Sequence, residues 1–187
     1  MFGTLCLSLF AMWASPAPQI AQANMTQSSS GAPAKAGLPA GDPYAPLRLY
    51  DGKWDVIPAG DGKPADTVHI ENQCAKVGDF FACNQFMNGK NMALVVILPS
   101  HPLDNGGYAY RNQALRSDGD GPGTWGKLEI VGDRWVYSND ATDNGKKTYW
   151  QTINIFSGTD KIHFEVQKSD DGTKWVTTMS GDEARAR

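Results

Sequence analysis

The chain has 187 residues and a formal net charge of −3, with 41% hydrophobic and 20% charged residues. No cluster of Lys and Arg stands out, which argues against nucleic acid as a partner, because phosphate binding needs such clusters. The sequence also has no basic amphipathic helix of the kind that lies on a membrane surface, and we expect no stable membrane insertion.

The first 23 residues have the pattern of an export signal. They carry no charge, residues 5–14 are mostly apolar, and residues 21–23 (Ala-Gln-Ala) form a site of the type that signal peptidase cuts. Residues 1–4 contain no Lys or Arg, so either translation begins upstream of Met1 or the signal is atypical. The apolar run is shorter than the roughly 20 residues that span a bilayer. We therefore predict a signal peptide over residues 1–23 and a periplasmic or secreted protein.

Residues 24–43 are rich in Ser, Gly, Ala and Pro, which bury little apolar surface, and we predict a flexible linker there. The folded domain then covers residues 44–187, a length that suits one domain with its own core. Of the three cysteines, Cys6 lies in the predicted signal. The mature chain keeps Cys74 and Cys83, an even number for an oxidising compartment.

A hairpin is predicted around Gly78 and Asp79, which form a good two-residue turn. This turn pairs Cys74 with Cys83 at a non-hydrogen-bonded position, where Cα atoms lie about 4.5 Å apart. That separation is within the range of a disulfide, so we predict a Cys74–Cys83 bridge. The alternative is two buried thiols.

The next hairpin turns at Asn88-Gly89 and pairs residue 85 with residue 92. Asn72 and Gln85 then lie opposite each other on the more apolar face of this three-stranded unit. That face, which we expect to point into the core, comprises Val68, Ile70, Asn72, Cys74, Phe81, Cys83, Gln85, Met87, Met92, Leu94 and Val96.

Residues 108–115 form another predicted strand with two mixed faces, so the orientation of Arg111 stays open. Residues 99–107 are expected to form a loop. Three later turns, near Gly132, Gly158 and Gly172, pair residue 130 with 135, 155 with 162 and 166 with 175. The inward residues on these strands are then Leu128, Ile130, Trp135, Tyr137, Tyr149, Gln151, Ile153, Ile155, Ile162, Phe164, Val166, Trp175, Thr177 and Met179.

Counted from Leu47, the sequence contains nine or ten short strands, each joined to the next by a turn. Such a meander usually closes into a barrel, because closure removes the exposed edges. We therefore predict an all-β, antiparallel up-and-down barrel. A two-sheet sandwich is the alternative.

Gly52 and Trp54 form a Gly-x-Trp motif on the first predicted strand. Together with residues 74–83, 162–166, 171–175 and 180–183, this motif resembles the lipocalin-like (calycin) superfamily, and in particular secreted bacterial proteins of unknown function that share its barrel. The resemblance implies that Trp54 plugs one end of the barrel under an Arg from the last strand. Arg185 and Arg187 are expected to lie beyond that strand. The resemblance also implies a small, largely apolar ligand inside the barrel.

Five polar residues are predicted to point inward, and we take them as candidate ligand-binding residues. A buried amide or hydroxyl without a partner costs about 1–3 kcal/mol. These residues therefore either bond to one another in a packed core or line a wet cavity and orient a ligand. They are Asn72, Gln85, Tyr137, Tyr149 and Gln151.

The sequence offers little support for an enzyme. His69 and His163 fall on the outward face and His101 falls in a loop, so no haem ligand or set of zinc ligands is evident. No inward pair of Asp or Glu is apparent for acid–base chemistry, and no nucleophile motif occurs. We predict no catalytic residue, no metal and no cofactor.

The favoured function is that of an exported binding or carrier protein for a small apolar molecule. One alternative is an interaction module with a filled core, acting through the outward aromatics Trp125, Trp150, Phe80 and Phe86. Another is an enzyme that uses the barrel interior, which would need an inward ionisable group. Arg111 is the single such group left unassigned. Ligand identity, cavity size and oligomeric state stay open.

Overall fold

The computed structural model describes residues 42–60, 63–64, 66–119 and 125–186. The predicted signal peptide, and the linker up to residue 41, lie outside these ranges. Within them, no helix is long and apolar enough to cross a membrane.

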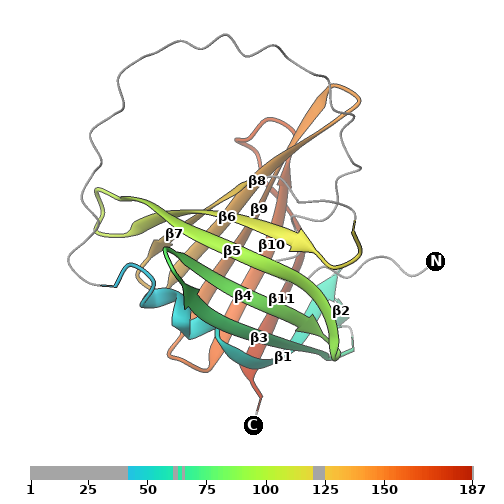
Figure 1. Cartoon of the computed structure of the whole chain (residues 1–187). Coiled ribbons are helices and arrows are strands. Elements are labelled where there is room, and N and C mark those ends of the chain that lie inside the picture. Colours follow the sequence, from blue (N-terminus) through green and yellow to red (C-terminus); the bar gives the residue numbers. More distant parts are fainter. Residues whose placement is uncertain (1–41, 61–62, 65, 120–124, 187) are drawn as a thin grey trace, which may run out of the picture.

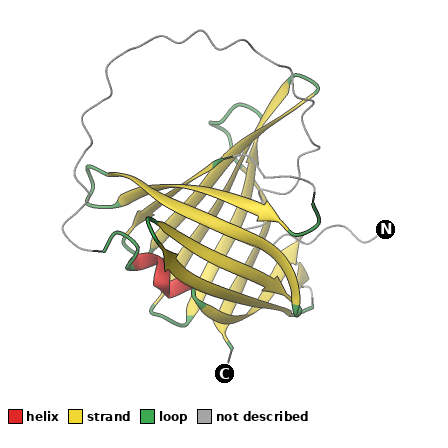
Figure 2. Cartoon of the chain, in the orientation of Figure 1, coloured by secondary structure: helices red, strands yellow, loops and turns green. Residues whose placement is uncertain are grey.

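The described residues form a closed antiparallel β-barrel (Figures 1 and 2). Ten strands each pair with the next along the chain, and the last strand pairs with the first. The green strands β3–β5 form the front wall in Figure 1. The strands are β1 (Gly52–Gly60), β3 (Val68–Val77), β4 (Phe80–Met87), β5 (Lys90–Pro102), β6 (Tyr108–Arg116), β7 (Gly126–Val131), β8 (Arg134–Asp143), β9 (Lys146–Ser157), β10 (Lys161–Ser169) and β11 (Val176–Arg185), with a two-residue strand β2 (Lys63–Pro64) beside β1.

This topology confirms the predicted up-and-down barrel and rules out the two-sheet sandwich, because the β1–β11 pairing closes the sheet. Two boundaries differ from expectation. The segment from Leu47 begins with a short 3₁₀ helix, η2 (Pro46–Tyr50), and strand β1 starts only at Gly52. His101 lies near the end of β5, where a loop was expected.

The Cys74–Cys83 disulfide is confirmed. The two residues are register partners in the β3–β4 hairpin, with Cα atoms 4.0 Å apart and the sulfur atoms bonded. The turn at Gly78-Asp79 has the predicted length, since Val77 pairs with Phe80. A disulfide of this kind points to an oxidising compartment.

Most side chains of strand β5 point to the opposite side of the sheet from the one predicted. The turn at Asn88-Gly89 is as expected, but a β-bulge follows and Gln85 pairs with Ala93. One extra residue reverses every later side chain. Met92, at the bulge, packs against the core as expected. The expectation that Leu94 and Val96 face the core is wrong, and Leu94 is 40% exposed. The residues of β5 that are buried instead are Ala93, Val95 and Ile97.

Strand β9 is also reversed relative to the prediction. Residues 158–160 form a three-residue loop, so Ser157 pairs with Lys161 and Asn154 pairs with Phe164. The predicted pairing of 155 with 162 assumed a shorter turn and is wrong. As a result the buried residues of β9 are Thr152, Asn154 and Phe156. Four residues expected to face inward belong to the opposite face: Tyr149, Gln151, Ile153 and Ile155.

The last hairpin has a longer loop than predicted. Val166 pairs with Met179, not with residue 175, and a bulge follows at Val166/Gln167. Met179 packs against the core as expected. Trp175 precedes β11 and Thr177 is exposed, so their predicted inward orientation is wrong.

One end of the barrel is closed around Trp54, whose side chain is fully buried. The Arg185 guanidinium lies 4.4 Å from the centre of the Trp54 ring. Arg185 donates hydrogen bonds to the carbonyl oxygens of Leu49 (2.9 Å), Asp51 (2.7 Å) and Thr159 (3.2 Å). The expectation that Arg185 lies beyond the last strand is wrong, because β11 continues to it and pairs it with Trp54.

The segment before β1 covers this closed end. The Tyr44 ring stacks on Phe81 with 5.7 Å between ring centres, and the Tyr110 hydroxyl donates to the carbonyl oxygen of Pro43 at 2.6 Å. Tyr50 lies against both Trp54 (6.2 Å) and Trp135 (6.3 Å). Residues 42–50 therefore fill the end of the barrel with aromatic side chains.

The contacts of Arg185 predict a large stability loss on substitution. Arg185→Met removes the cation–π contact and three hydrogen bonds from a charged donor, and we expect the free energy of unfolding to fall by about 2–4 kcal/mol. Urea denaturation with the disulfide intact measures this. The control is Arg48→Met, which removes an exposed ion pair with Asp42 and should cost less than about 1 kcal/mol. Equal losses in the two variants would contradict the proposed role of Arg185.

Candidate functional site

Asn72 and Gln85 lie together inside the barrel, as the register predicted. Gln85 Nε2 donates to Asn72 Oδ1 at 2.9 Å, and Asn72 Nδ2 donates to the carbonyl oxygen of Tyr50 at 3.3 Å. Both side chains are buried. Their hydrogen bonds connect β3 and β4 to the closed end, which matches the packed-core alternative of the sequence analysis.

Tyr137 also points into the barrel, and it has a charged neighbour that the sequence analysis missed. Burial, together with the negative charge of Glu183, raises the pKa of the Tyr137 hydroxyl. Glu183 itself is only 2% exposed, and its register partners on the neighbouring strands are Val56 on β1 and Ile162 on β10. The expectation that Arg111 is the one possible inward ionisable group is therefore wrong. The signal was present, because Met179 was placed inward and alternation carries that face to Glu183.

Two further buried amides have no hydrogen-bond partner in the described part of the chain. Asn112 on β6 and Asn154 on β9 are both fully buried, and neither the Nδ2 nor the Oδ1 atom of either is paired. The sequence analysis missed Asn154 because of the slip in the β9 register. It missed Asn112 because both faces of β6 are mixed in composition. Such orphaned groups are costly.

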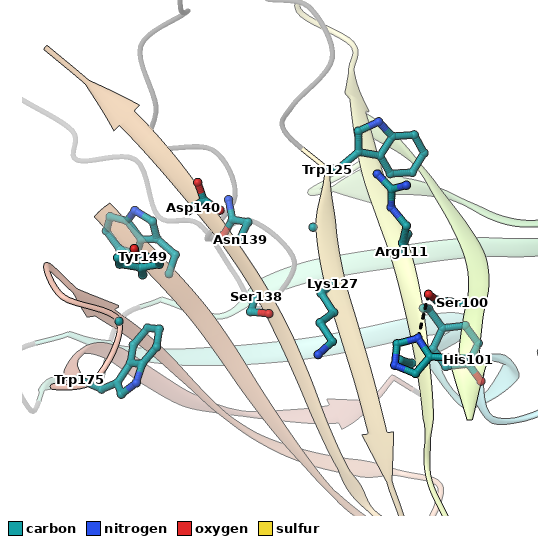
Figure 3. Close-up of a pocket in the computed structure, with 15 residues that line it drawn as sticks. Ser100, His101, Arg111, Trp125, Lys127, Ser138, Asn139, Asp140, Tyr149 and Trp175 are labelled. Atoms are coloured by element: carbon teal, nitrogen blue, oxygen red, sulfur yellow. Dashed lines mark hydrogen bonds between the residues drawn. The ribbon is translucent and has the colours of Figure 1, made fainter. Parts of the chain in front are cut away.

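A cavity of about 490 Å³ is bordered by strands β5–β9 and the loop between β10 and β11. Figure 3 shows Arg111 and Trp125 on one side of it and Tyr149 and Trp175 on the other. We call it the aromatic cavity, after the side chains Trp125, Tyr149, Trp150 and Trp175 that line it.

Strand alternation places most of its polar lining on the outer face of the sheet. Leu128 on β7 and Tyr137 on β8 are buried in the core, so their neighbours Lys127 and Ser138 point the other way. Arg111 likewise follows the buried Tyr110 and is exposed. Its orientation, left open by the sequence, is therefore outward.

Three of the four rings have a cation over one face. Arg111 Cζ lies 4.7 Å from the centre of the Trp125 ring. Lys147 Nζ lies 4.9 Å from that of Tyr149, and Lys168 Nζ lies 5.6 Å from that of Trp150. Contacts of this kind hold both the ring and the cation in place.

The loop at residues 170–175 forms one wall of the cavity. The Asp171 carboxylate accepts hydrogen bonds from the backbone N–H groups of Thr173 and Lys174, each at 2.8 Å. These bonds hold the pKa of Asp171 well below its usual range, and the bond from Lys174 has the largest effect. A Cβ atom at Gly172 would lie 3.5 Å from the Tyr149 ring, so the loop packs directly against that ring.

The structure divides the five predicted ligand-binding residues between two regions. Asn72, Gln85 and Tyr137 are buried inside the barrel, while Tyr149 lines the aromatic cavity. Gln151 donates to Gln167 Oε1 at 2.6 Å on the outer face. The predicted convergence of all five inside the barrel is wrong, because the β9 register turns Tyr149 and Gln151 outward.

Of the four aromatics proposed as outward, Phe80 and Trp125 are exposed. Phe86 pairs with Glu71 on the outer face. Trp150 instead packs against the core while also lining the cavity. The tryptophans of the cavity come from three distant parts of the sequence, and no motif links them.

The described residues show no assembled catalytic or metal centre. Ser100 Oγ and His101 Nδ1 are 3.0 Å apart at the cavity edge, but both residues are exposed and no carboxylate among the described residues orients the imidazole. Within the same ranges, no group of three His, Cys, Asp or Glu side chains is arranged to hold a metal ion.

Comparison with known proteins gives a structural likeness but no family. No protein-family model matches the sequence, and no curated protein matches it. Among solved structures, the chain is similar to the crystal structure of Rv2717c from M. tuberculosis, with 15% sequence identity and a TM-score of 0.40. The match covers 79% of this chain and 99% of that chain. Function must therefore be inferred from the residues of this chain.

The two kinds of buried amide predict opposite mutational effects. Asn154→Leu replaces an unpaired buried amide with an apolar group of similar size and should raise the free energy of unfolding by about 1–3 kcal/mol. Asn72→Leu leaves Gln85 without its partner and should lower it by a similar amount, about 1–3 kcal/mol. Denaturant unfolding with unchanged m-values tests both. If both variants changed the free energy of unfolding in the same direction, the distinction between an unpaired Asn154 and a hydrogen-bonded Asn72 would be wrong.

The hydrogen bonds to Asp171 predict a pH-dependent contribution to loop stability. Because its pKa is lowered by folding, protonation favours the unfolded state. The contribution is complete above the ordinary Asp pKa of about 3.9 and is lost as the pH falls through the folded-state value. Asp171→Asn should therefore have a lower free energy of unfolding than the wild type at pH 7. This difference should shrink as the pH falls.

Unfolding measured from pH 7 to pH 2 tests this expectation. The neighbouring Asp170→Asn serves as the control, since Asp170 makes an exposed ion pair with Lys146. If the difference in free energy of unfolding between Asp171→Asn and the wild type stayed constant across this range, the role of the Asp171 carboxylate would be refuted.

Proposed function

We propose that the protein is an exported, lipocalin-like carrier, periplasmic or secreted, that binds a small and largely apolar molecule in the aromatic cavity. The observation that carries this proposal is the gathering of three tryptophans and two tyrosines around a space of about 490 Å³. Ligand sites in proteins typically occupy about 300–1,000 Å³ and combine aromatic walls with a few polar groups.

Two further features support the lipocalin-like and exported parts of the proposal. The Gly52-x-Trp54 motif opens the first strand of a closed barrel, and Arg185 from the last strand stacks on Trp54. The Cys74–Cys83 disulfide is of the kind that persists in oxidising compartments.

We assign the ligand to the aromatic cavity because Asn72 and Gln85 of the predicted interior site are occupied by their own contacts. Asn72 and Gln85 bond to each other and to Tyr50. The closed end is filled by the rings of Tyr50, Trp54 and Trp135. Around the aromatic cavity, by contrast, Trp125 keeps 45% of its surface exposed.

A neutral fluorescent probe, N-phenyl-1-naphthylamine, tests the proposal. We expect saturable fluorescence enhancement with the purified protein. Trp125→Ala and Trp175→Ala should each weaken binding about tenfold, because each removes an apolar wall worth roughly 1.4 kcal/mol.

The matched control is Phe80→Ala, because Phe80 is exposed to the same extent as Trp125, 45%, and lies outside the cavity lining. Its removal should leave the affinity unchanged. No saturable binding by the wild type, or equal weakening by all three substitutions, would reject the aromatic cavity as the site.

A further inference from the structure

Arg111 differs in its contacts from three other arginines of the barrel. Arg48, Arg116 and Arg185 each donate hydrogen bonds to carboxylate or carbonyl oxygens. Arg111, in the aromatic cavity, contacts the face of Trp125 and makes no hydrogen bond or ion pair with any described residue. Within the described ranges, no residue occupies its N–H donors.

The other charged groups of the cavity are already paired. Lys127 Nζ lies 2.7 Å from Glu129 Oε1, and Asp140 Oδ2 lies 3.2 Å from Lys147 Nζ. These pairs cancel in charge, which leaves the guanidinium of Arg111 as the uncompensated charge among the described ionised side chains that line the cavity.

The contact with Trp125 prepares Arg111 for an anion. A guanidinium stacked on an indole keeps its planar edge of N–H donors exposed, and that edge matches the two oxygens of a carboxylate or sulfonate. Because the ring already restricts the side chain, less conformational freedom is lost when an anion binds.

We propose that the aromatic cavity selects organic anions, that is, molecules with a flat, apolar body and one carboxylate- or sulfonate-type group. The body lies against Tyr149 and Trp175, and the anionic group accepts hydrogen bonds from Arg111. This inference rests on the proposed function, since it names the class of ligand for the same cavity.

Two probes that share their rings test the selection. 1-Anilinonaphthalene-8-sulfonate carries a sulfonate, and N-phenyl-1-naphthylamine is its uncharged counterpart. We expect the wild type to bind the sulfonate more tightly, with an affinity that falls as salt is added. Arg111→Gln should weaken sulfonate binding roughly tenfold and change binding of the neutral probe less than about twofold.

Arg134→Gln is the matched control, because Arg134 is an exposed arginine of β8 outside the cavity lining. An equal loss of sulfonate binding in this variant would show a general charge effect and overturn the inference. Equal weakening of both probes by Arg111→Gln would also overturn it, since Arg111 would then act only by holding Trp125.

The two proposals fail in distinguishable ways. If the wild type binds both probes equally, anion selection is wrong while the aromatic cavity remains the binding site. If the wild type binds neither probe, the proposed function fails, and the inference fails with it. Tighter sulfonate binding that depends on Arg111 alone supports both.

Discussion

The pairing of β1 with β11 at Trp54 and Arg185 is the constraint on which the barrel depends. It turns a meander into a ring, so that none of the ten long strands in the described ranges keeps an open edge. It also brings Arg185 over Trp54 and within hydrogen-bond distance of the carbonyl groups that precede β1. A Cβ atom at Gly52 would lie 2.7 Å from Arg185 Nη1, so the glycine of the Gly-x-Trp motif leaves room for this contact. With the ring closed, each residue faces either the core or the outer surface.

The sequence predicts these faces correctly where a two-residue turn sets the register and no bulge follows. The turns at Gly78-Asp79 and Gly132-Asp133 place Cys74 opposite Cys83 and Leu128 opposite Tyr137, as expected. The errors occur where extra residues enter, at the bulge after Gln85, in the 158–160 loop and in the longer loop before β11. A one-residue slip reverses a whole strand, and none of these insertions has a local signal strong enough to reveal it.

The candidate site was harder to predict than the fold. Periodicity tells which side of a strand a residue occupies, but it does not tell where the outer surface is concave. Arg111, Tyr149 and Trp175 come from β6, β9 and the last loop, and only the twist and length of those segments bring them around one cavity. Glu183 is a different case, because simple alternation from Met179 already placed it inside the barrel. The expectation of an apolar interior drew attention away from it.

The closing contact also has a consequence for how the chain acquires its structure. Arg185 and the carbonyl group of Asp51 are 134 residues apart in sequence, yet they meet at 2.7 Å. Neighbouring strands can zip together pairwise, but the ring cannot shut until β11 has emerged from the ribosome. Any sheet that forms before that moment has two unpaired edges. A chaperone that shields strand edges would find its substrate in that interval.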